Sequence, residues 1–135
     1  MKEGYFSNYN WKDKLVLIVE DDLSSCYYLK EVLSGTQLHI YIVTNGEDAI
    51  VECKNRKVDL VLMDIQLPGI NGYITTREIK RIFPHLPVIA QTAYAMADDR
   101  NKCFEAGCDD YISKPIDPIS LLEKMNYFLN NFVNP

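Results

Sequence analysis

The fold of this chain is decided by residues 58–69, which read VDLVLMDIQLPG. Apolar residues fill positions 58–63 except at Asp59, a pattern typical of a strand that is buried on both faces of a parallel sheet. The run ends on a carboxylate, Asp64, and the following pair Pro68-Gly69 turns the chain. Taken alone, Asp64 is best interpreted as a turn residue or a helix cap. The rest of the chain gives it another role.

Length and composition limit the classes of protein to consider. The 135 residues give room for one domain with a hydrophobic core, and a hydrophobic content of 47% argues against a disordered chain. The apolar runs fall far short of the roughly 20 residues that span a bilayer. Residues 1–5 contain no apolar stretch of the signal-peptide kind, so we expect a cytoplasmic location and no membrane contact by this domain.

The net charge of −5 argues against nucleic acid as a direct partner and is compatible with a cluster of carboxylates that attracts a cation. The four cysteines, Cys26, Cys53, Cys103 and Cys108, form no CxxC pair and match no zinc-binding spacing. We therefore expect them to be reduced and mostly buried.

Apolar runs and helical periodicity alternate along the chain. The runs predict strands at 15–19, 38–43, 58–63, 86–90 and 110–113. The periodicity predicts helices at 23–33, 47–55, 73–82, 95–106 and 119–132. Residues 1–13 lack either pattern, so the expected division is a linker over 1–13, a domain over 14–132 and a tail over 133–135.

The same periodicity predicts which residues face the core and where helices stop. The residues expected to face inward are Leu29, Val32, Leu33, Ile74, Ile79, Ile82, Leu122, Met125, Phe128, Leu129 and Phe132, with Tyr28 beside the first three. Either Asp22 or Ser24 can cap the first helix, and Gly35 is its predicted stop. Tyr9 and Trp11 are expected to pack on the side of the domain.

Strands that alternate with helices through short loops predict a parallel sheet with helices on both faces. Such sheets bind ligands at the carboxyl ends of their strands. The polar residues expected at those ends are Glu20 and Asp21, Asp64, Thr92 and Lys114. Each has an ordinary alternative when taken alone, as a helix cap, a turn residue or a surface lysine. Their coincidence at the ends of four strands favours a shared site.

Three carboxylates at one edge repel one another unless a positive charge lies between them. Mg²⁺ meets this need because it takes oxygen ligands, keeps several waters and is held by one or two carboxylates together with a phosphate. Lys114 suits a phosphoryl oxygen as a point charge, and Thr92 can donate its hydroxyl to another. Asp64 is then the predicted nucleophile, which forms an aspartyl phosphate.

Four segments of the chain resemble the signatures of response regulator receiver domains. These segments are LIVEDD at 17–22, MDIQLPGING at 63–72, QTA at 91–93 and YISKP at 111–115, and the resemblance covers roughly 14–132. It implies a flavodoxin-like α/β fold, a doubly wound (βα)5 sandwich with a five-stranded parallel sheet of order 2-1-3-4-5. It also implies a phospho-acceptor that catalyses its own phosphotransfer and its own dephosphorylation.

The resemblance assigns roles to individual residues. It implies Asp64 as the phospho-acceptor, Asp21 as a direct metal ligand, Glu20 as a ligand that acts through water, and the backbone carbonyl of Gln66 as a further ligand, for Mg²⁺ or alternatively Mn²⁺. Many members have Asp where this chain has Glu20, and both types occur.

The resemblance also implies a switch and a backbone feature. Movement of the Thr92 hydroxyl toward the phosphoryl group lets Tyr111 turn inward, which remodels the surface made by the fourth helix, the fifth strand and the fifth helix. A cis peptide bond is implied before Pro115. Gln66 and Tyr94 stand two places after Asp64 and Thr92, so we expect them to tune the lifetime of the phosphoryl group.

The expected partners are the phosphohistidine domain of a histidine kinase, a histidine phosphotransfer domain, or both, with a weak homodimer as an addition. The runs at 92–96 and 106–111 look like those of receivers in hybrid sensor histidine kinases, which is the preferred context. The alternatives are a stand-alone regulator, since no output module is expected after the last helix, and a pseudo-receiver that docks without phosphorylation. A haloacid-dehalogenase-type phosphatase is disfavoured, because that family needs a second Asp where this chain has Gln66.

Overall fold

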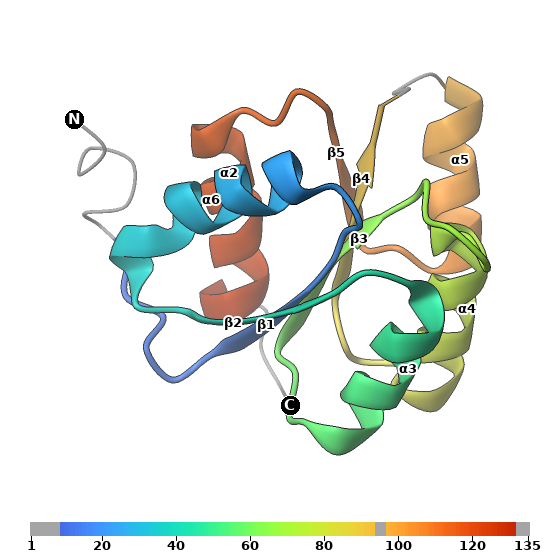
Figure 1. The fold of residues 1–135 in the computed structure, drawn as a ribbon, viewed down its shortest axis with the longest axis horizontal. Helices are drawn as coiled ribbons and strands as arrows, with labels where there is room; N and C mark the ends of the chain where they lie inside the picture. Colours follow the sequence, from blue (N-terminus) through green and yellow to red (C-terminus); the bar gives the residue numbers. More distant parts are fainter. Residues whose placement is uncertain (1–8, 94–96, 132–135) are drawn as a thin grey trace.

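Strands and helices alternate in the computed structural model, which describes residues 9–93 and 97–131 (Figure 1). The strands are β1 (Leu15–Val19), β2 (His39–Val43), β3 (Leu60–Asp64), β4 (Val88–Thr92) and β5 (Asp110–Ser113). The helices are α2 (Leu23–Leu33), α3 (Gly46–Asn55), α4 (Gly72–Ile82), α5 (Ala97–Ala106) and α6 (Pro118–Asn126). A 3-10 turn, η1 (Ser34–Thr36), follows α2, and a π-helical turn, η2 (Tyr127–Asn131), follows α6.

The strands form one parallel sheet in the order β2-β1-β3-β4-β5. β3 lies at the centre of this sheet, and all five of its residues are buried, as the apolar run at 58–63 predicts. Val19 pairs with Met63, and Asp64 pairs with Gln91, so the carboxyl ends of β1, β3 and β4 lie level with one another. The prediction of a doubly wound sheet with this strand order is confirmed.

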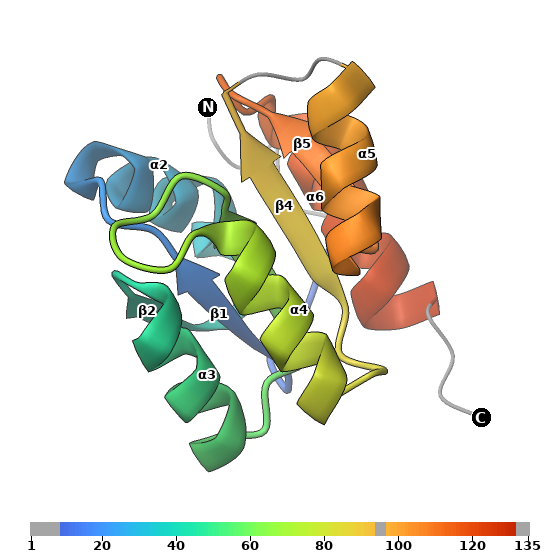
Figure 2. The ribbon, with the colours of Figure 1, turned by 90° about the vertical axis from the view of Figure 1, so that its right-hand side faces the viewer.

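Helices cover both faces of the sheet: α2 and α6 lie on one face, and α3, α4 and α5 lie on the other (Figures 1 and 2). Side chains of β3 alternate between the two resulting cores. Leu60 and Leu62 pack with α2 and α6, whereas Val61 and Met63 pack on the opposite face. Polar side chains at the strand ends are therefore held by a sheet that is anchored on both sides.

The segment before β1 is attached to the domain through Trp11. This side chain is 1% exposed and belongs to the core beside α2 and α6. Its indole N–H donates to Asn126 Oδ1 at 3.3 Å, and its backbone N–H donates to the carbonyl of Thr36 at 2.7 Å. The ring of Tyr9 lies 5.2 Å from the indole, so the expected packing of both aromatic residues on the domain is found.

One prediction about the core is wrong in α4. Ile74 was expected to face inward with Ile79, but its side chain is 47% exposed. Five residues separate the two, which places them about 140° apart around a helix with 3.6 residues per turn. The buried face consists instead of Gly72, Thr75, Thr76 and Ile79. Two threonines thus lie on the buried face, where the apolar pattern had placed Ile74.

The end of α2 also differs from the prediction. Its C-cap is Ser34, and η1 continues the turn through Gly35, so the left-handed residue that ends this region is Gln37 (φ 63°). At the start of α2 the cap is Asp22, whose side chain accepts from Ser25 N–H. Tyr28 is more exposed than expected, although its hydroxyl donates to the carbonyl of Ile116 at 2.7 Å.

The remaining predictions concern the cysteines, the last helix and the membrane. Cys26, Cys53, Cys103 and Cys108 are unpaired and buried, as expected. The expected helix over 119–132 is divided into α6 and η2, and Phe132 lies outside the described residues. Within the described ranges, no helix combines the length and apolar character that crossing a membrane requires.

Candidate functional site

The polar residues predicted to lie at the carboxyl ends of the strands are found there in the structure. Glu20 follows β1, Asp64 ends β3, Thr92 ends β4, and Lys114 follows β5. The arrowheads of β1 and β4 point to the same edge of the sheet in Figure 2. This edge is therefore where the candidate site is built.

Three carboxylates form the acidic part of the site. Glu20, Asp21 and Asp64 each offer one carboxylate oxygen within 4.8 Å of the others. Glu20 is 1% exposed and Asp64 is 5% exposed, whereas Asp21 is exposed. Two of the acids are thus held inside the domain, and the third opens the cluster to solvent.

Lys114 supplies the positive charge next to these acids. Its ammonium nitrogen lies 3.3 Å from Glu20 Oε1 and 3.6 Å from Asp64 Oδ1. Its backbone N–H donates to the carbonyl of Thr92 at 2.8 Å, which ties the residue after β5 to the end of β4. The Lys114–Pro115 peptide bond is cis, the form that the resemblance implied.

The balance of charge in the cluster is negative. Burial, followed by the neighbouring Asp64 carboxylate, raises the pKa of Glu20 to about 7, although the Lys114 ammonium acts in the opposite direction. The Lys114 ammonium alone therefore does not neutralise the repulsion between the neighbouring carboxylates. Hard oxygen donors at this spacing, with Asp21 open to solvent, fit a divalent cation such as Mg²⁺, which prefers carboxylate oxygens and retains waters.

Backbone groups around Asp64 fix its position. The N–H of Gln66 donates to Asp64 Oδ1 at 3.1 Å, while the Gln66 side chain is exposed. The N–H of Gly72 donates to the carbonyl of Ile65 at 3.0 Å and joins the start of α4 to the end of β3. A Cβ on Gly72 would lie 2.5 Å from the carbonyl oxygen of Asp64, so only glycine permits this close approach. Sequence analysis missed this role, although Gly72 lies within the quoted motif at 63–72.

Thr92 ends β4, and Tyr111 lies in the neighbouring strand β5, two residues before its end. Thr92 is 4% exposed. Tyr111 is partly buried, its hydroxyl accepts a hydrogen bond from Arg100 at 3.3 Å, and its ring meets Phe104 edge-on at 6.1 Å between centroids. Both contacts join β5 to α5. Tyr94, the second residue expected to tune phosphoryl lifetime, lies outside the described residues.

A second polar residue in β4 was missed. Gln91 is fully buried, and neither its amide nitrogen nor its amide oxygen has a hydrogen-bond partner within the described ranges. The signal was present in the sequence, because glutamine is an unusual residue at the end of a buried apolar run.

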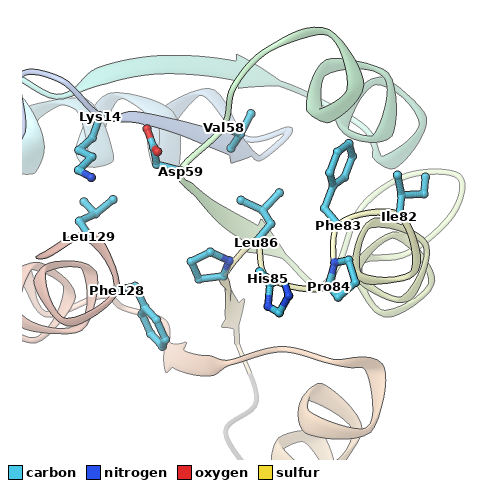
Figure 3. A pocket seen from close by; sticks show the side chains of 11 residues that line it. Lys14, Val58, Asp59, Ile82, Phe83, Pro84, His85, Leu86, Phe128 and Leu129 are labelled. Atoms are coloured by element: carbon cyan, nitrogen blue, oxygen red, sulfur yellow. The ribbon is translucent and has the colours of Figure 1, made fainter. Parts of the chain in front are cut away.

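A separate cavity of about 400 Å³ lies far from this cluster, at the amino-terminal edge of the sheet (Figure 3). It is lined by the loop between α4 and β4, by Val58 and Asp59 just before β3, and by Phe128 and Leu129 of η2. Its carboxylate, Asp59, accepts the backbone N–H of Leu15 at 2.8 Å. This structural hydrogen bond gives Asp59 a role in holding β1 beside the entry to β3.

Comparison with known sequences gives a consistent result. A family model described as the response regulator receiver domain matches residues 16–126. The transcriptional regulatory protein ZraR of Salmonella typhimurium is 32% identical over 102 residues, which cover 76% of this chain and 23% of that protein. The chain thus spans about a quarter of the length of ZraR. Hybrid signal transduction histidine kinase I of Dictyostelium discoideum is 38% identical over 120 residues, covering 82% of this chain and 7% of the kinase.

Other relatives match over nearly their full length. The polar-differentiation response regulator DivK of Brucella anthropi is 34% identical over 120 residues, which cover 87% of this chain and 98% of DivK. The receiver domain of the sensor histidine kinase PA1611 of Pseudomonas aeruginosa, solved with magnesium in its active-site cleft, superposes with a TM-score of 0.80 at 30% identity, covering 86% of this chain and 97% of that one. The receiver domain of Saccharomyces cerevisiae Ssk1, solved with the histidine phosphotransfer protein Ypd1, gives a TM-score of 0.80 at 26% identity, with coverages of 85% and 88%.

Proposed function

The chain belongs to the response regulator receiver domain family of two-component signalling, and from this premise we propose that Asp64 accepts a phosphoryl group from a phosphohistidine. The observation that carries the proposal is the environment of Asp64. This carboxylate ends the central strand, is 5% exposed, and has the Lys114 ammonium 3.6 Å away and two further carboxylates beside it. A nucleophilic carboxylate, a cation for the phosphoryl oxygens and a metal-binding group are thereby together.

The proposed transfer uses groups of this chain in defined roles. An oxygen of Asp64 attacks phosphorus and forms an O–P bond while the P–N bond to the donor histidine breaks. The imidazole leaves with the electron pair of that bond, and Asp64 becomes an acyl phosphate. Lys114 donates to one phosphoryl oxygen and the Thr92 hydroxyl to another, so that charge on these oxygens meets donors already in place.

A divalent ion completes the proposed site. The residues that would hold it are Glu20, Asp21 and Asp64, with the backbone carbonyl of Gln66, for Mg²⁺ or alternatively Mn²⁺. When bound, the ion supplies positive charge that stabilises the phosphoryl group during transfer and binding. We also assign Gln66 and Tyr94 to tuning the rate at which the acyl phosphate is hydrolysed.

The response to phosphorylation is proposed to pass through Thr92 and Tyr111. Movement of the Thr92 hydroxyl toward the new phosphoryl oxygens leaves space for the Tyr111 ring to turn inward. The Arg100 contact to the Tyr111 hydroxyl would then break, and the edge-on contact with Phe104 would change. The surface formed by α5, β5 and α6 is accordingly the proposed output.

The proposed donor is a histidine kinase or a histidine phosphotransfer domain. Leu23 and Tyr27 of α2 are 75% and 73% exposed, and they lie within six residues of Asp21 at the mouth of the site. Apolar side chains next to a reactive group suit a protein that must bring its phosphohistidine to Asp64. A cytoplasmic setting and a weak homodimer remain part of the proposal.

We propose a hybrid sensor histidine kinase as the parent context, with a stand-alone regulator as the second candidate. The 38% identity to the hybrid kinase of Dictyostelium discoideum supports the first. Coverage of 98% of DivK supports the second. The direction of phosphoryl flow depends on which of these two contexts holds, because a receiver in a hybrid kinase can pass the phosphoryl group onward to a phosphotransfer domain.

A calorimetric titration with Mg²⁺ tests the metal-binding part of the proposal. Asp21→Asn is expected to weaken binding at least about tenfold, because one charged oxygen ligand is lost. The matched control is Asp98→Asn, which removes an exposed carboxylate in the first turn of α5 and should leave the affinity unchanged. Equal affinities for the wild type and both variants would contradict the assignment of the acidic cluster.

A further inference from the structure

The cavity at the amino-terminal edge of the sheet combines apolar walls with two opposite charges. Its volume of about 400 Å³ falls within the range of small-molecule sites. Phe128 and Leu129 of η2 lie on one side of the cavity, and Phe83 and Leu86 lie on the other (Figure 3). These walls leave room for an apolar group between η2 and the loop that follows α4.

Lys14 and Asp59 bring the two charges to this cavity from neighbouring strands. Lys14 directly precedes β1, Asp59 directly precedes β3, and these two strands pair with each other. The N–H of Asp59 donates to the carbonyl of Leu15 at 2.8 Å, and Asp59 Oδ2 accepts the N–H of Leu15 at 2.8 Å. Both charged residues are half-buried in the cavity wall, so a molecule inside the cavity can reach their side chains.

Both charged groups are open to a ligand. Among the residues that the structure describes, the Lys14 ammonium makes no ion pair and Asp59 Oδ1 accepts no hydrogen bond. His85 also lines the cavity but is exposed. An anion would be attracted by Lys14 and repelled by Asp59, and a cation would meet the reverse. A molecule that carries both charges is attracted by both residues.

We propose that this cavity binds a small zwitterionic molecule, an α-amino acid with an apolar side chain. The carboxylate of the ligand accepts from the Lys14 ammonium, its own ammonium donates to Asp59 Oδ1, and its side chain packs between Leu129 and Leu86. No covalent step is involved. The inference does not depend on phosphorylation of Asp64, so each can fail without the other.

A titration of the full chain with L-phenylalanine, followed by amide resonances in ¹H–¹⁵N NMR spectra, tests this inference. For a ligand of this size we expect a dissociation constant of about 1 mM, with shifts concentrated in residues 58–59, 82–86 and 128–129. Two matched ligands each lack one charge: 3-phenylpropionate has no ammonium, and 2-phenylethylamine has no carboxylate. Each should bind the wild type about fivefold more weakly than phenylalanine.

Two variants assign the charges to their partners. Lys14→Met keeps an apolar stem and should weaken phenylalanine binding about fivefold, without weakening that of 2-phenylethylamine. Asp59→Asn keeps an oxygen for the N–H of Leu15 and should weaken phenylalanine binding to a similar extent, without weakening that of 3-phenylpropionate. The matched control is Lys12→Met, at an exposed lysine outside the cavity, which should leave all three affinities unchanged.

Three results would overturn the proposal. The first is equal binding of the three ligands to the wild type, which would show that the charges take no part and needs no variant to fold. The second is an unchanged affinity for phenylalanine in folded Lys14→Met. The third is the absence of shifts around the cavity at about 10 mM phenylalanine.

Discussion

Replacing Gly72 with alanine should destabilise the domain and displace Asp64. An alanine Cβ at this position would lie 2.5 Å from the carbonyl oxygen of Asp64 and 2.7 Å from the Cα of Ile65. Ordinary contact begins at 3.4 Å, so the start of α4 and the end of β3 must separate by about 0.9 Å. The opposing atoms belong to the backbone of the central strand, which the ladder with β4 holds in place through the Asp64–Gln91 pair.

The magnitude follows from three contributions. Overpacking of a tight contact costs about 1–3 kcal/mol. The hydrogen bond from Gly72 N–H to the Ile65 carbonyl, now 3.0 Å, would lengthen beyond bonding distance and cost about 1 kcal/mol more. Loss of glycine freedom in the unfolded chain returns roughly 0.4–1 kcal/mol. The net loss is about 1–4 kcal/mol, equivalent to a fall in Tm of several degrees to roughly 15 °C for a domain of this size.

Urea unfolding followed by tryptophan fluorescence measures this loss directly. Trp11, the single tryptophan, is 1% exposed and reports the folded core. The matched control is Gly35→Ala, at an exposed glycine with no positive φ, which should stabilise the fold by about 0.4–1 kcal/mol. In Gly72→Ala, misplacement of Asp64 should also slow its phosphorylation about tenfold or more. If Gly72→Ala proved as stable as Gly35→Ala, the argument from close backbone approach would be refuted.

Two further variants test other parts of the structure. Trp11→Ala should lower the free energy of unfolding by about 3–5 kcal/mol, because the side chain is fully buried and hydrogen-bonded to Asn126. Thermal unfolding followed by circular dichroism measures this change. A loss below about 1 kcal/mol would mean that the segment before β1 is not part of the folded unit. Gln91→Leu should raise the free energy of unfolding by about 1–2 kcal/mol, because two unpartnered buried groups are removed. Urea unfolding measures this change, and marked destabilisation would show that the carboxamide is hydrogen-bonded in solution.

The sequence was sufficient to predict the sheet and the position of its reactive edge. Continuous apolar runs identify β1 and β3 as buried on both faces, and each run is followed by an acidic residue, Glu20 or Asp64. Once the strands are parallel, their carboxyl ends must meet, so convergence of these acids with Lys114 follows from topology alone. These two predictions succeed because they require only the spacing of apolar residues along the chain and the parallel arrangement of strands that are connected through helices.

Details of packing could not be predicted in the same way. Hydrophobicity favoured Ile74 over Thr75 and Thr76, yet helix geometry buries the threonines. Thr75 is accommodated because its hydroxyl donates to the carbonyl of Asn71 at 2.9 Å. The contact of Gly72 with Asp64 depends on a distance of a few tenths of an ångström, which no periodicity encodes.

The missing partner of Gln91 is also a property of the packed state. A buried glutamine is unusual in a sequence, but only the surrounding side chains determine whether its amide is paired. The neighbours of Gln91 come from α2, β4 and the loop after β5, which are far apart in the chain. Whether a polar side chain is satisfied is therefore decided after the elements assemble.

The most direct test of Asp64 as the phospho-acceptor is the intact mass of the protein after incubation with acetyl phosphate, with and without Mg²⁺, for the wild type and for Asp64→Asn. We expect a gain of one phosphoryl group in the wild type that requires Mg²⁺ and is absent in the variant. A folded wild type that gains no phosphoryl group, or an Asp64→Asn variant that gains it equally, would contradict the assignment of Asp64 as the phospho-acceptor.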